Sequence, residues 1–428
     1  MSWKTYRLGD ILERKRVSVK IEKDELYKLV TIKLYHQGVI MREEKKGDDI
    51  KSNMFYVNTG DFILSGIDAR NGAFGIVPKE LDGAIVTNDF WILEPNPEIM
   101  RKDFFLFITS TPLFDYICKQ CSDGTTQRIR LQRDKFYDYE LSLPSIDEQQ
   151  LLVHKLTNYN QNSRKLSDEL THQLTLVKQL RQSFLREAMQ GKLVAQNPAD
   201  GNAKDLLVKI KAEKAKSGKK EKPLPAIKEE EIPFEIPESW VWCRLGEITN
   251  YGTSLKADPT DLKEDTWVLD LEDIEKESSK LIEKKRFKER NSLSTKSRFI
   301  VGDVLYSKLR PYLDKVIVAD EIGVCTTEIL PLKCFAEMNP FFLRYSLKRE
   351  DFLLYVNSVT KGMKMPRLGT KEGELALIPL PPFSEQQAIV SKLDELMLMC
   401  DELEQSIKSS QEQNEKLLQQ VLREALRG

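Results

Sequence analysis

Two short stretches, Leu141–Gln150 (LSLPSIDEQQ) and Leu377–Gln387 (LIPLPPFSEQQ), decide the fold that the sequence predicts. In each, proline stops an apolar run, because it cannot donate the hydrogen bond that the interior of a strand requires. A serine or aspartate then supplies a helix cap, and Glu148 or Glu385 falls in the first turn, where the helix dipole favours an anion. Each stretch therefore marks the end of a globular domain and the start of a helix.

The helices that begin here are long, because neither proline nor glycine recurs before Gly191 in the first or Gly428 in the second. From Glu148 to Ala188, a helix extends about 60 Å at 1.5 Å per residue. Apolar residues recur at alternating spacings of four and three, so each helix carries one seam that needs a partner, and we expect the two seams to pair. The predicted seam residues are Leu152, Leu156, Leu166, Leu170 and Leu180 in the first helix and Ile389, Leu393, Leu396, Leu403 and Leu417 in the second.

The heptads leave the direction of this helix pair open. An antiparallel pair places Ser163 opposite Ser410, whereas a parallel pair places Gln173 opposite Ser410, and both arrangements match polar seam positions. The alternative, in which each seam packs on its own globular domain, leaves most of a rod of about 60 Å uncovered.

The chain is an internal repeat. The pattern W-x-x-x-R-L-G-[DE]-I opens both copies, at Trp3 and at Trp240, and the offset of 237 residues returns at the two E-Q-Q triplets. Between them, Gly60 and Gly302 are 242 residues apart, which indicates a shared scaffold with loops of different length. Short alternating strands punctuated by Gly and Pro predict an α+β domain in each copy, with a pseudo-two-fold repeat about the helix pair. The predicted parts are a first domain (1–147), a first long helix (148–191), a linker (192–237), a second domain (238–384) and a second long helix (385–428).

The linker is charged and rich in proline. Over residues 192–231 it carries ten Lys against seven Asp or Glu. Its first part is compatible with a short charged helix and its second with an extended, Pro-directed segment. We expect a solvated tether here in preference to a DNA contact.

Composition and motifs exclude most self-contained chemistry. The chain has 66 basic and 67 acidic residues, a net charge of −1, so any nucleic-acid surface must be local. No G-x-G or P-loop pattern is present, and the lone C-x-x-C of Cys118 and Cys121 lacks a second pair for zinc. We therefore predict no catalytic residue, no metal and no cofactor bound by this chain. With six cysteines and no stretch of membrane-spanning length, a cytoplasmic protein is expected.

Local basic clusters recur before the strand that leads to each long helix. Arg and Lys interleaved with Tyr, Thr and Gln are typical of phosphate clamping and base-edge reading, so these clusters predict DNA contacts. In the first copy the candidates are Thr125, Thr126, Gln127, Arg128, Arg130 and Arg133, with Ser65 and Arg70 from an earlier segment. In the second copy they are Lys361, Lys364 and Arg367, with Tyr306, Ser307, Lys308, Arg310 and Tyr312 from the corresponding earlier segment.

These features together resemble the specificity (S) subunit of type I restriction-modification systems over essentially the whole chain. The resemblance rests on the repeated opening pattern, on GDVLYSKLRPYL in the second copy, and on LPLPPFSEQQ before the second helix and its LSLPSIDEQQ counterpart before the first. It rests also on the central run from LREAMQGKLVAQNP through KAEKAKSGKKEKPLP to IPESWVW. One departure is that the segment from Ser65 to Arg70 reads SGIDAR where the second copy has SKLRPY.

The resemblance implies a non-catalytic subunit with two target recognition domains, each reading one half of a bipartite, asymmetric site in double-stranded DNA. It implies an antiparallel helix pair that acts as a spacer and docks two methyltransferase (M) subunits, with restriction (R) subunits joining for cleavage. S-adenosylmethionine, ATP and Mg²⁺ are then expected on those partners.

Two other functions are open to the residues alone. One is a DNA-independent adaptor scaffold with two domains on a coiled coil. The other is a self-contained DNA adenine methyltransferase, although the run Asn339-Pro340-Phe341-Phe342 lacks the second proline of the Asn-Pro-Pro-Phe motif and is better explained as a helix start.

Overall fold

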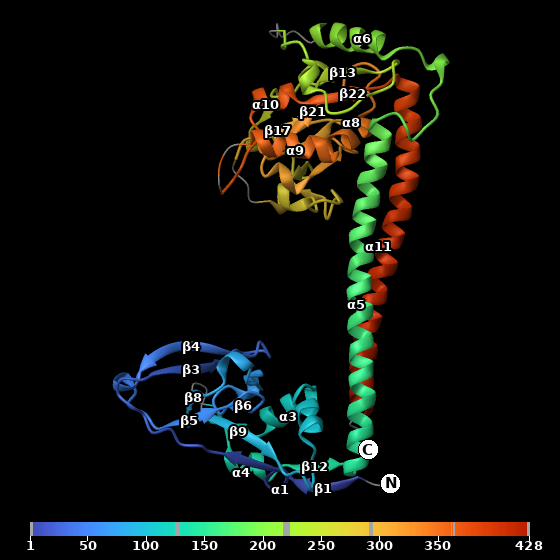
Figure 1. Ribbon diagram of the computed structural model, residues 1–428. Helices are drawn as coiled ribbons and strands as arrows, with labels where there is room; N and C mark the ends of the chain where they lie inside the picture. Colours follow the sequence, from blue (N-terminus) through green and yellow to red (C-terminus); the bar gives the residue numbers. More distant parts are fainter. Residues whose placement is uncertain are drawn as a thin grey trace. The chain divides into compact units, whose positions relative to one another are not determined.

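The computed structural model (Figure 1) describes residues 3–124, 129–216, 223–290, 294–360, 362 and 364–425, with the side chains of 422, 423 and 425 left aside. The chain divides into two compact units. Unit 1 comprises Met1–Leu170 and Ser409–Gly428, and unit 2 comprises Thr171–Lys408. Each unit therefore contains one globular domain together with part of both long helices.

Unit 1 is built on two four-stranded sheets and a separate antiparallel pair of strands. Its core gathers Phe62, Phe105 and Phe114, whose rings meet edge to face at centroid distances of 5.1 and 5.7 Å from Phe62. The pair is β1 (Lys4–Arg7) with β12 (Glu140–Leu143). The first sheet has the strand order β2 (Leu12–Lys15), β9 (Phe90–Pro95), β6 (Phe62–Ser65), β7 (Phe74–Ile76). The second sheet has the order β4 (Val39–Lys46), β3 (Leu26–Ile32), β8 (Ala84–Thr87), β5 (Met54–Val57). The remaining elements are α1 (Leu8–Ile11), α2 (Lys102–Thr109), α3 (Pro112–Gln120), the strand pair β10 (Ser122–Asp123) and β11 (Arg130–Leu131), and α4 (Arg133–Tyr137).

Unit 2 repeats this plan with a differently built sheet. The pair β13 (Val241–Arg244) and β22 (Leu377–Leu380) has the same antiparallel pairing as β1 and β12. The five-stranded sheet has the order β14 (Lys256–Ala257), β17 (Lys296–Phe299), β20 (Gly323–Cys325), β15 (Trp267–Leu269), β16 (Lys285–Arg286). The three-stranded sheet has the order β19 (Val316–Val318), β18 (Val304–Ser307), β21 (Ile329–Leu332). The helices are α6 (Ala203–Lys216), α7 (Leu245–Ile248), α8 (Pro340–Leu347), α9 (Glu350–Val359) and α10 (Thr370–Leu375). The two mixed α/β domains of the predicted repeat are confirmed.

The long helices are α5 (Ile146–Met189) and α11 (Phe383–Ala425). The Glu148 carboxylate accepts hydrogen bonds from the backbone N–H and the Oγ of Ser145, at 3.0 and 2.9 Å, as a capping residue does. In the second copy Glu385 instead accepts from Trp240 Nε1 at 2.8 Å. The predicted cap is therefore found at α5, whereas α11 begins directly after Pro382, so that Ser384 lies inside its first turn and does not cap it.

In each unit the two helices lie side by side and antiparallel (Figure 1). In unit 1, Ser163 Oγ donates to Asn414 Oδ1 at 3.1 Å and Asn414 Nδ2 donates to the Ser163 carbonyl at 3.0 Å. In unit 2, Arg181 Nη2 donates to Asp401 at 2.6 Å, so the partner's number falls as the number along α5 rises. The direction implied by the resemblance is confirmed, and Ser163 faces Asn414, one turn away from the predicted Ser410.

The predicted seam is only half right. Leu156, Leu170, Ile389 and Leu393 are buried, whereas Leu152 and Leu396 are half-buried. The prediction is wrong for four leucines that are exposed: Leu166, Leu180, Leu403 and Leu417. The physical reason is that the predicted seam consists of two rows of side chains, each with a seven-residue spacing. One row points into the contact between the helices, and the other lies along the flank of the pair.

The described parts of the linker, 192–216 and 223–237, are not a solvated tether, which corrects that prediction. Helix α6 buries Leu206 and Ile210 in the core of unit 2, and Arg244 donates to the carbonyl oxygen of Pro225 at 2.8 Å. Among the lysines of α6, apolar residues recur at helical spacing and form one apolar face. Burial of this face determines where α6 packs on unit 2.

The burial of the seam yields a first prediction. Leu393→Ala, at a fully buried position, should lower the free energy of unfolding by about 2–5 kcal/mol, because it leaves a cavity in a packed core. The matched variant Leu403→Ala, whose side chain is 49% exposed, should change it by about 0.5 kcal/mol or less. Urea unfolding followed by circular dichroism measures both, and equal losses would contradict the one-row seam.

Candidate nucleic-acid interface

Three separate segments of unit 1 meet where strand β6 ends. The Gly66 N–H donates to the Asp89 carbonyl at 2.8 Å, and the Leu131 N–H donates to the Gly66 carbonyl at 2.8 Å. Beside these backbone bonds, Arg130 Nη1 lies 3.2 Å from Asp89 Oδ1. We call this arrangement the loop junction of unit 1.

Unit 2 contains the same junction, where strand β18 ends. The Lys308 N–H donates to the Glu328 carbonyl at 3.0 Å, and the Leu368 N–H donates to the Lys308 carbonyl at 2.9 Å. Arg367 Nε lies 3.0 Å from Glu328 Oε2. Arg367 is 237 residues after Arg130, so backbone bonds and ion pair recur together in both copies.

The loop junction of unit 2 brings together the two clusters that the sequence singled out. The Arg310 N–H donates to the Pro366 carbonyl at 2.8 Å, and Leu309 forms an isolated antiparallel bridge with Arg367. Lys308 and Arg310 are half-buried, and the more exposed side chains around them are Tyr312, Lys364 and Arg367. These residues form a cationic surface with one exposed aromatic ring.

The backbone that carries Arg310 is strained. Arg310 has φ +50° and Asp314 has φ +49°, a left-handed conformation that costs about 1–3 kcal/mol for residues with a Cβ. The strained turn is held by a buried ion pair in which Lys348 Nζ lies 2.7 Å from Asp314 Oδ2. Burial raises the pKa of Asp314 to about 6, and burial also lowers the pKa of Lys348. Buried charges of this kind fix a conformation at the cost of desolvation.

Three predicted contacts are corrected, because their side chains point into the protein. Tyr306 is 2% exposed and packs edge to face against Phe352, so its ring belongs to the core. Ser307 is equally buried and donates to the Leu309 carbonyl, and the buried Ser65 accepts from the Asp68 N–H. The two serines shape the turn after the strand and do not face solvent.

The other candidates in unit 1 come from three elements, and the turn that carries Arg70 contacts β11, which carries Arg130. Arg130 and Arg133 are exposed, and Arg70 is half-buried in a 3-10 turn (Ala69–Asn71). Some predicted contacts lie outside the described residues: Thr125, Thr126, Gln127, Arg128 and Lys361.

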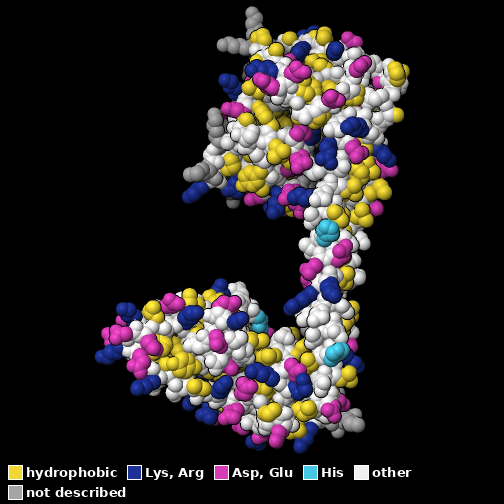
Figure 2. All heavy atoms as spheres, viewed as in Figure 1, with side chains coloured by type: hydrophobic (Ala, Val, Ile, Leu, Met, Phe, Trp, Pro, Cys, Tyr) yellow, Lys and Arg dark blue, Asp and Glu magenta, His cyan; other side chains and the backbone are white. Residues whose placement is uncertain are grey.

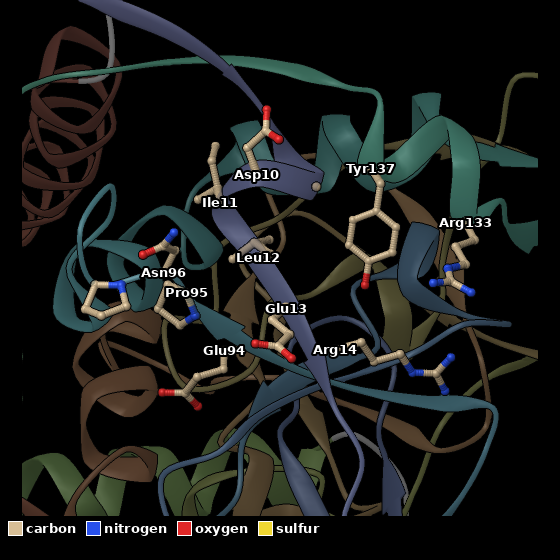
Figure 3. A pocket seen from close by; sticks show the side chains of 12 residues that line it. Asp10, Ile11, Leu12, Glu13, Arg14, Glu94, Pro95, Asn96, Arg133 and Tyr137 are labelled. Carbon is tan, nitrogen blue, oxygen red and sulfur yellow. The ribbon is translucent and has the colours of Figure 1, made fainter.

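Arg133 lines a cavity of about 920 Å³ in unit 1, shown in Figure 3. Its guanidinium lies 5.8 Å from the centre of the Tyr137 ring, and Arg14 lines the same side of the cavity. Arg14 donates to the Phe90 carbonyl and lies over the Trp91 ring at 5.1 Å. Burial, reinforced by the charge of nearby Arg16, lowers the pKa of Arg14 to about 10.

Sequence reasoning missed Arg14 and Arg16. Arg14 lies in β2 and Arg16 follows directly after its last residue, Lys15, and residues two apart in an extended chain share one face. That spacing was the available signal, but the neighbours that make the cluster, Arg133 and Tyr137, come from α4.

Charges of both signs are mixed on the visible face of the molecule. On the face seen in Figure 2, Lys and Arg side chains are interspersed with Asp and Glu over both units. Within the described part of the chain, no cluster of His, Cys, Asp or Glu could hold a metal ion, and no helix is long and apolar enough to cross a membrane. Cys118 and Cys121 are buried thiols, and burial raises the pKa of both.

Solved structures share this fold over nearly their whole length. A chain from a type I R-M system, described in terms of complex assembly and conformational transition, has a TM-score of 0.70 at 18% identity and covers 100% of this chain and 98% of its own. The HsdS subunit from Thermoanaerobacter tengcongensis has a TM-score of 0.58 at 18% identity, covering 100% and 97%.

Sequence comparison identifies the family. The model of the type I restriction modification DNA specificity domain matches residues 1–176 and again 237–413, once in each copy. The EcoAI specificity subunit of Escherichia coli is 32% identical over 86% of this chain and 72% of its own length, and the EcoDI specificity subunit of the same species is 26% identical over 100% and 88%. This chain therefore belongs to the type I restriction-modification DNA specificity family.

Proposed function

We propose that each globular domain of this specificity subunit reads one half of a bipartite, asymmetric target in double-stranded DNA through its loop junction. The subunit itself contributes recognition, and adenine methylation and cleavage are performed by two M subunits and by R subunits. S-adenosylmethionine, ATP and Mg²⁺ belong to those partners in this proposal.

The observation that carries the proposal is the recurrence of the junction. In both copies an Arg–acid ion pair stands beside the same two backbone hydrogen bonds, at Arg130 with Asp89 and at Arg367 with Glu328. An arginine held in a fixed place on a rigid turn suits bidentate contact with a phosphate or with a guanine edge.

Divergence around the junction supports two unlike half-sites. Gly66 and Asp68 stand where the second copy has Lys308 and Arg310. The backbone bonds at the junction use main-chain atoms, so they tolerate these changes in side chain. The two domains then present different charges from the same scaffold, as an asymmetric target requires.

The helix pair supplies both a spacer and a docking surface in this proposal. In unit 1, Leu166 and Leu417 are exposed on the pair, and in unit 2 so are Leu398, Met399 and Leu403. Apolar side chains on the flank of two paired helices suit further helices that complete the packing. We assign these flanks to the M subunits.

The spacer role predicts a change in the target. Four residues, close to one helical turn, lengthen a helix by about 6 Å, nearly two base pairs of B-DNA. Inserting four residues into α5 and four into α11, at the facing positions Ser163 and Asn414, should lengthen the non-specific spacer and preserve both half-sites. Methylation-aware sequencing of cells that express the variant with its M subunit reads the motif. A control that substitutes four exposed helix residues without changing length should leave the motif unaltered, and a changed half-site with the original spacer would contradict the role.

Arg310 and Lys364 test the phosphate contacts. Arg310→Ala and Lys364→Ala should each weaken binding to cognate and unrelated duplexes alike. They should also reduce the slope of log affinity against log salt by about 1, because one phosphate contact is lost. Lys204→Ala, on the exposed side of α6, is the matched control and should change neither quantity. A loss confined to one base position would instead assign base reading to the residue.

The two junctions can be separated by neutralising their acids. Glu328→Gln and Asp89→Asn keep the backbone bonds and release the paired arginines. Each variant should therefore relax the sequence preference of one half-site, a different half for each. Competition binding with duplex libraries, using the chain together with its M subunit, compares the two. If both variants affected the same half-site, or neither affected any, the assignment of one domain to one half would be wrong.

A further inference from the structure

The two copies differ most in what covers the short helix after their first strand. In unit 2 this helix, α7, is covered by the linker. Lys211 of α6 lies 2.7 Å from Glu247 Oε1, Lys214 Nζ donates to the Gly246 carbonyl, and Glu213 accepts from the Ala336 N–H at 2.7 Å. The linker is thus a built part of the second domain.

Residues Leu224–Glu231, which we call the strap, come after α6 in the chain. The strap neutralises a buried arginine. The Arg244 side chain is 3% exposed and donates to the carbonyl oxygens of Pro225 and Ala226, at 2.8 and 3.2 Å. Its guanidinium also lies 3.0 Å from Glu231 Oε2. A Cβ added at Gly246 would lie 3.0 Å from Leu224, which shows how closely the strap approaches.

The corresponding surface of unit 1 is open. Arg7 stands where the second copy has Arg244, yet its side chain is 64% exposed, and its guanidinium lies 3.6 Å from Asp138. Gly9 corresponds to Gly246 and is exposed. The three atoms nearest to a Cβ built at Gly9 all belong to Tyr137 of the same domain.

The acid that receives a linker lysine is preserved on this open surface. Asp10 corresponds to Glu247, is exposed, and has no ion-pair partner among the residues the structure describes. Gly9 and Asp10 line the cavity of about 920 Å³, together with Asn96 and Tyr137 (Figure 3). The cavity therefore lies where the linker docks in the other copy.

We propose that this surface of unit 1 docks a segment of a partner polypeptide built like α6 (203–216) and the strap (224–231). Its chemistry is defined by what the second copy accepts: a lysine-bearing amphipathic helix that meets Asp10, followed by a strap whose carbonyl oxygens and carboxylate meet Arg7. The partner supplies the segment in trans, because α6 and the strap of this chain are already packed in unit 2.

The test uses the full chain and a fluorescent peptide of residues 203–236. Fluorescence anisotropy should detect saturable binding of one peptide per chain. Asp10→Lys should weaken it about tenfold, because a lysine of the peptide then faces a like charge. The peptide variant Lys211→Glu should restore binding to Asp10→Lys. Asp24→Lys, an exposed acid in the turn before β3, is the matched control and should have no effect.

Three outcomes would overturn the proposal. One is the lack of saturable binding, and another is binding that responds to Glu247→Lys but not to Asp10→Lys, which means that the peptide displaces its own copy in unit 2. The third is a gain in affinity for duplex DNA in Asp10→Lys that exceeds the gain in Asp24→Lys, without peptide binding, which assigns the cavity to nucleic acid through Arg14 and Arg133. Asp10 is exposed, so thermal melting should show Asp10→Lys folded as the parent. Peptide binding is measured without DNA, and the duplex in the third outcome carries no target sequence, so neither measurement depends on the proposed half-site reading.

Discussion

The structure depends on one constraint, which is that a helix of more than forty residues with an apolar row must be covered along its length. Helices α5 and α11 meet this constraint by pairing with each other. The apolar row alone permits sliding by a turn or a reversal of direction. The hydrogen bonds between Ser163 and Asn414, and the contact of Arg181 with Asp401, are satisfied in one antiparallel register. Polar groups in the seam thus specify the arrangement that the leucines stabilise.

The repeated domains separate scaffold from recognition in a similar way. At each loop junction, main-chain hydrogen bonds hold the turn after a strand, and those bonds impose no choice of side chain. Gly66 in one copy and Lys308 in the other make the same backbone contacts. Residues that meet a ligand can therefore diverge while the turn keeps its place.

The sequence predicted the features whose signals are local, and it failed where tertiary packing decides. Proline positions and heptad spacing predicted α5 and α11, and the repeat predicted two similar domains. Tyr306 was misjudged because its strand is buried on both faces, so the basic loop begins only at Lys308. Arg14 was missed because its neighbours come from another element. In the linker, Leu206 and Ile210 form the buried apolar face of α6. The prediction of a solvated tether rested on the many lysines around them, so these two residues were overlooked.

At both loop junctions an arginine is paired with an acid, and this pairing affects how strongly the arginine can bind a phosphate. An unpaired cationic surface attracts any phosphate backbone, so most of its free energy of binding is non-specific. An arginine already paired with an acid, as Arg130 is with Asp89 and Arg367 with Glu328, gains less from a phosphate because it must give up that partner. Such a residue contributes most where a base edge offers a bidentate acceptor of matching geometry. In the proposed function, pairing each arginine would lower the affinity for DNA of any sequence more than it lowers the discrimination between sequences.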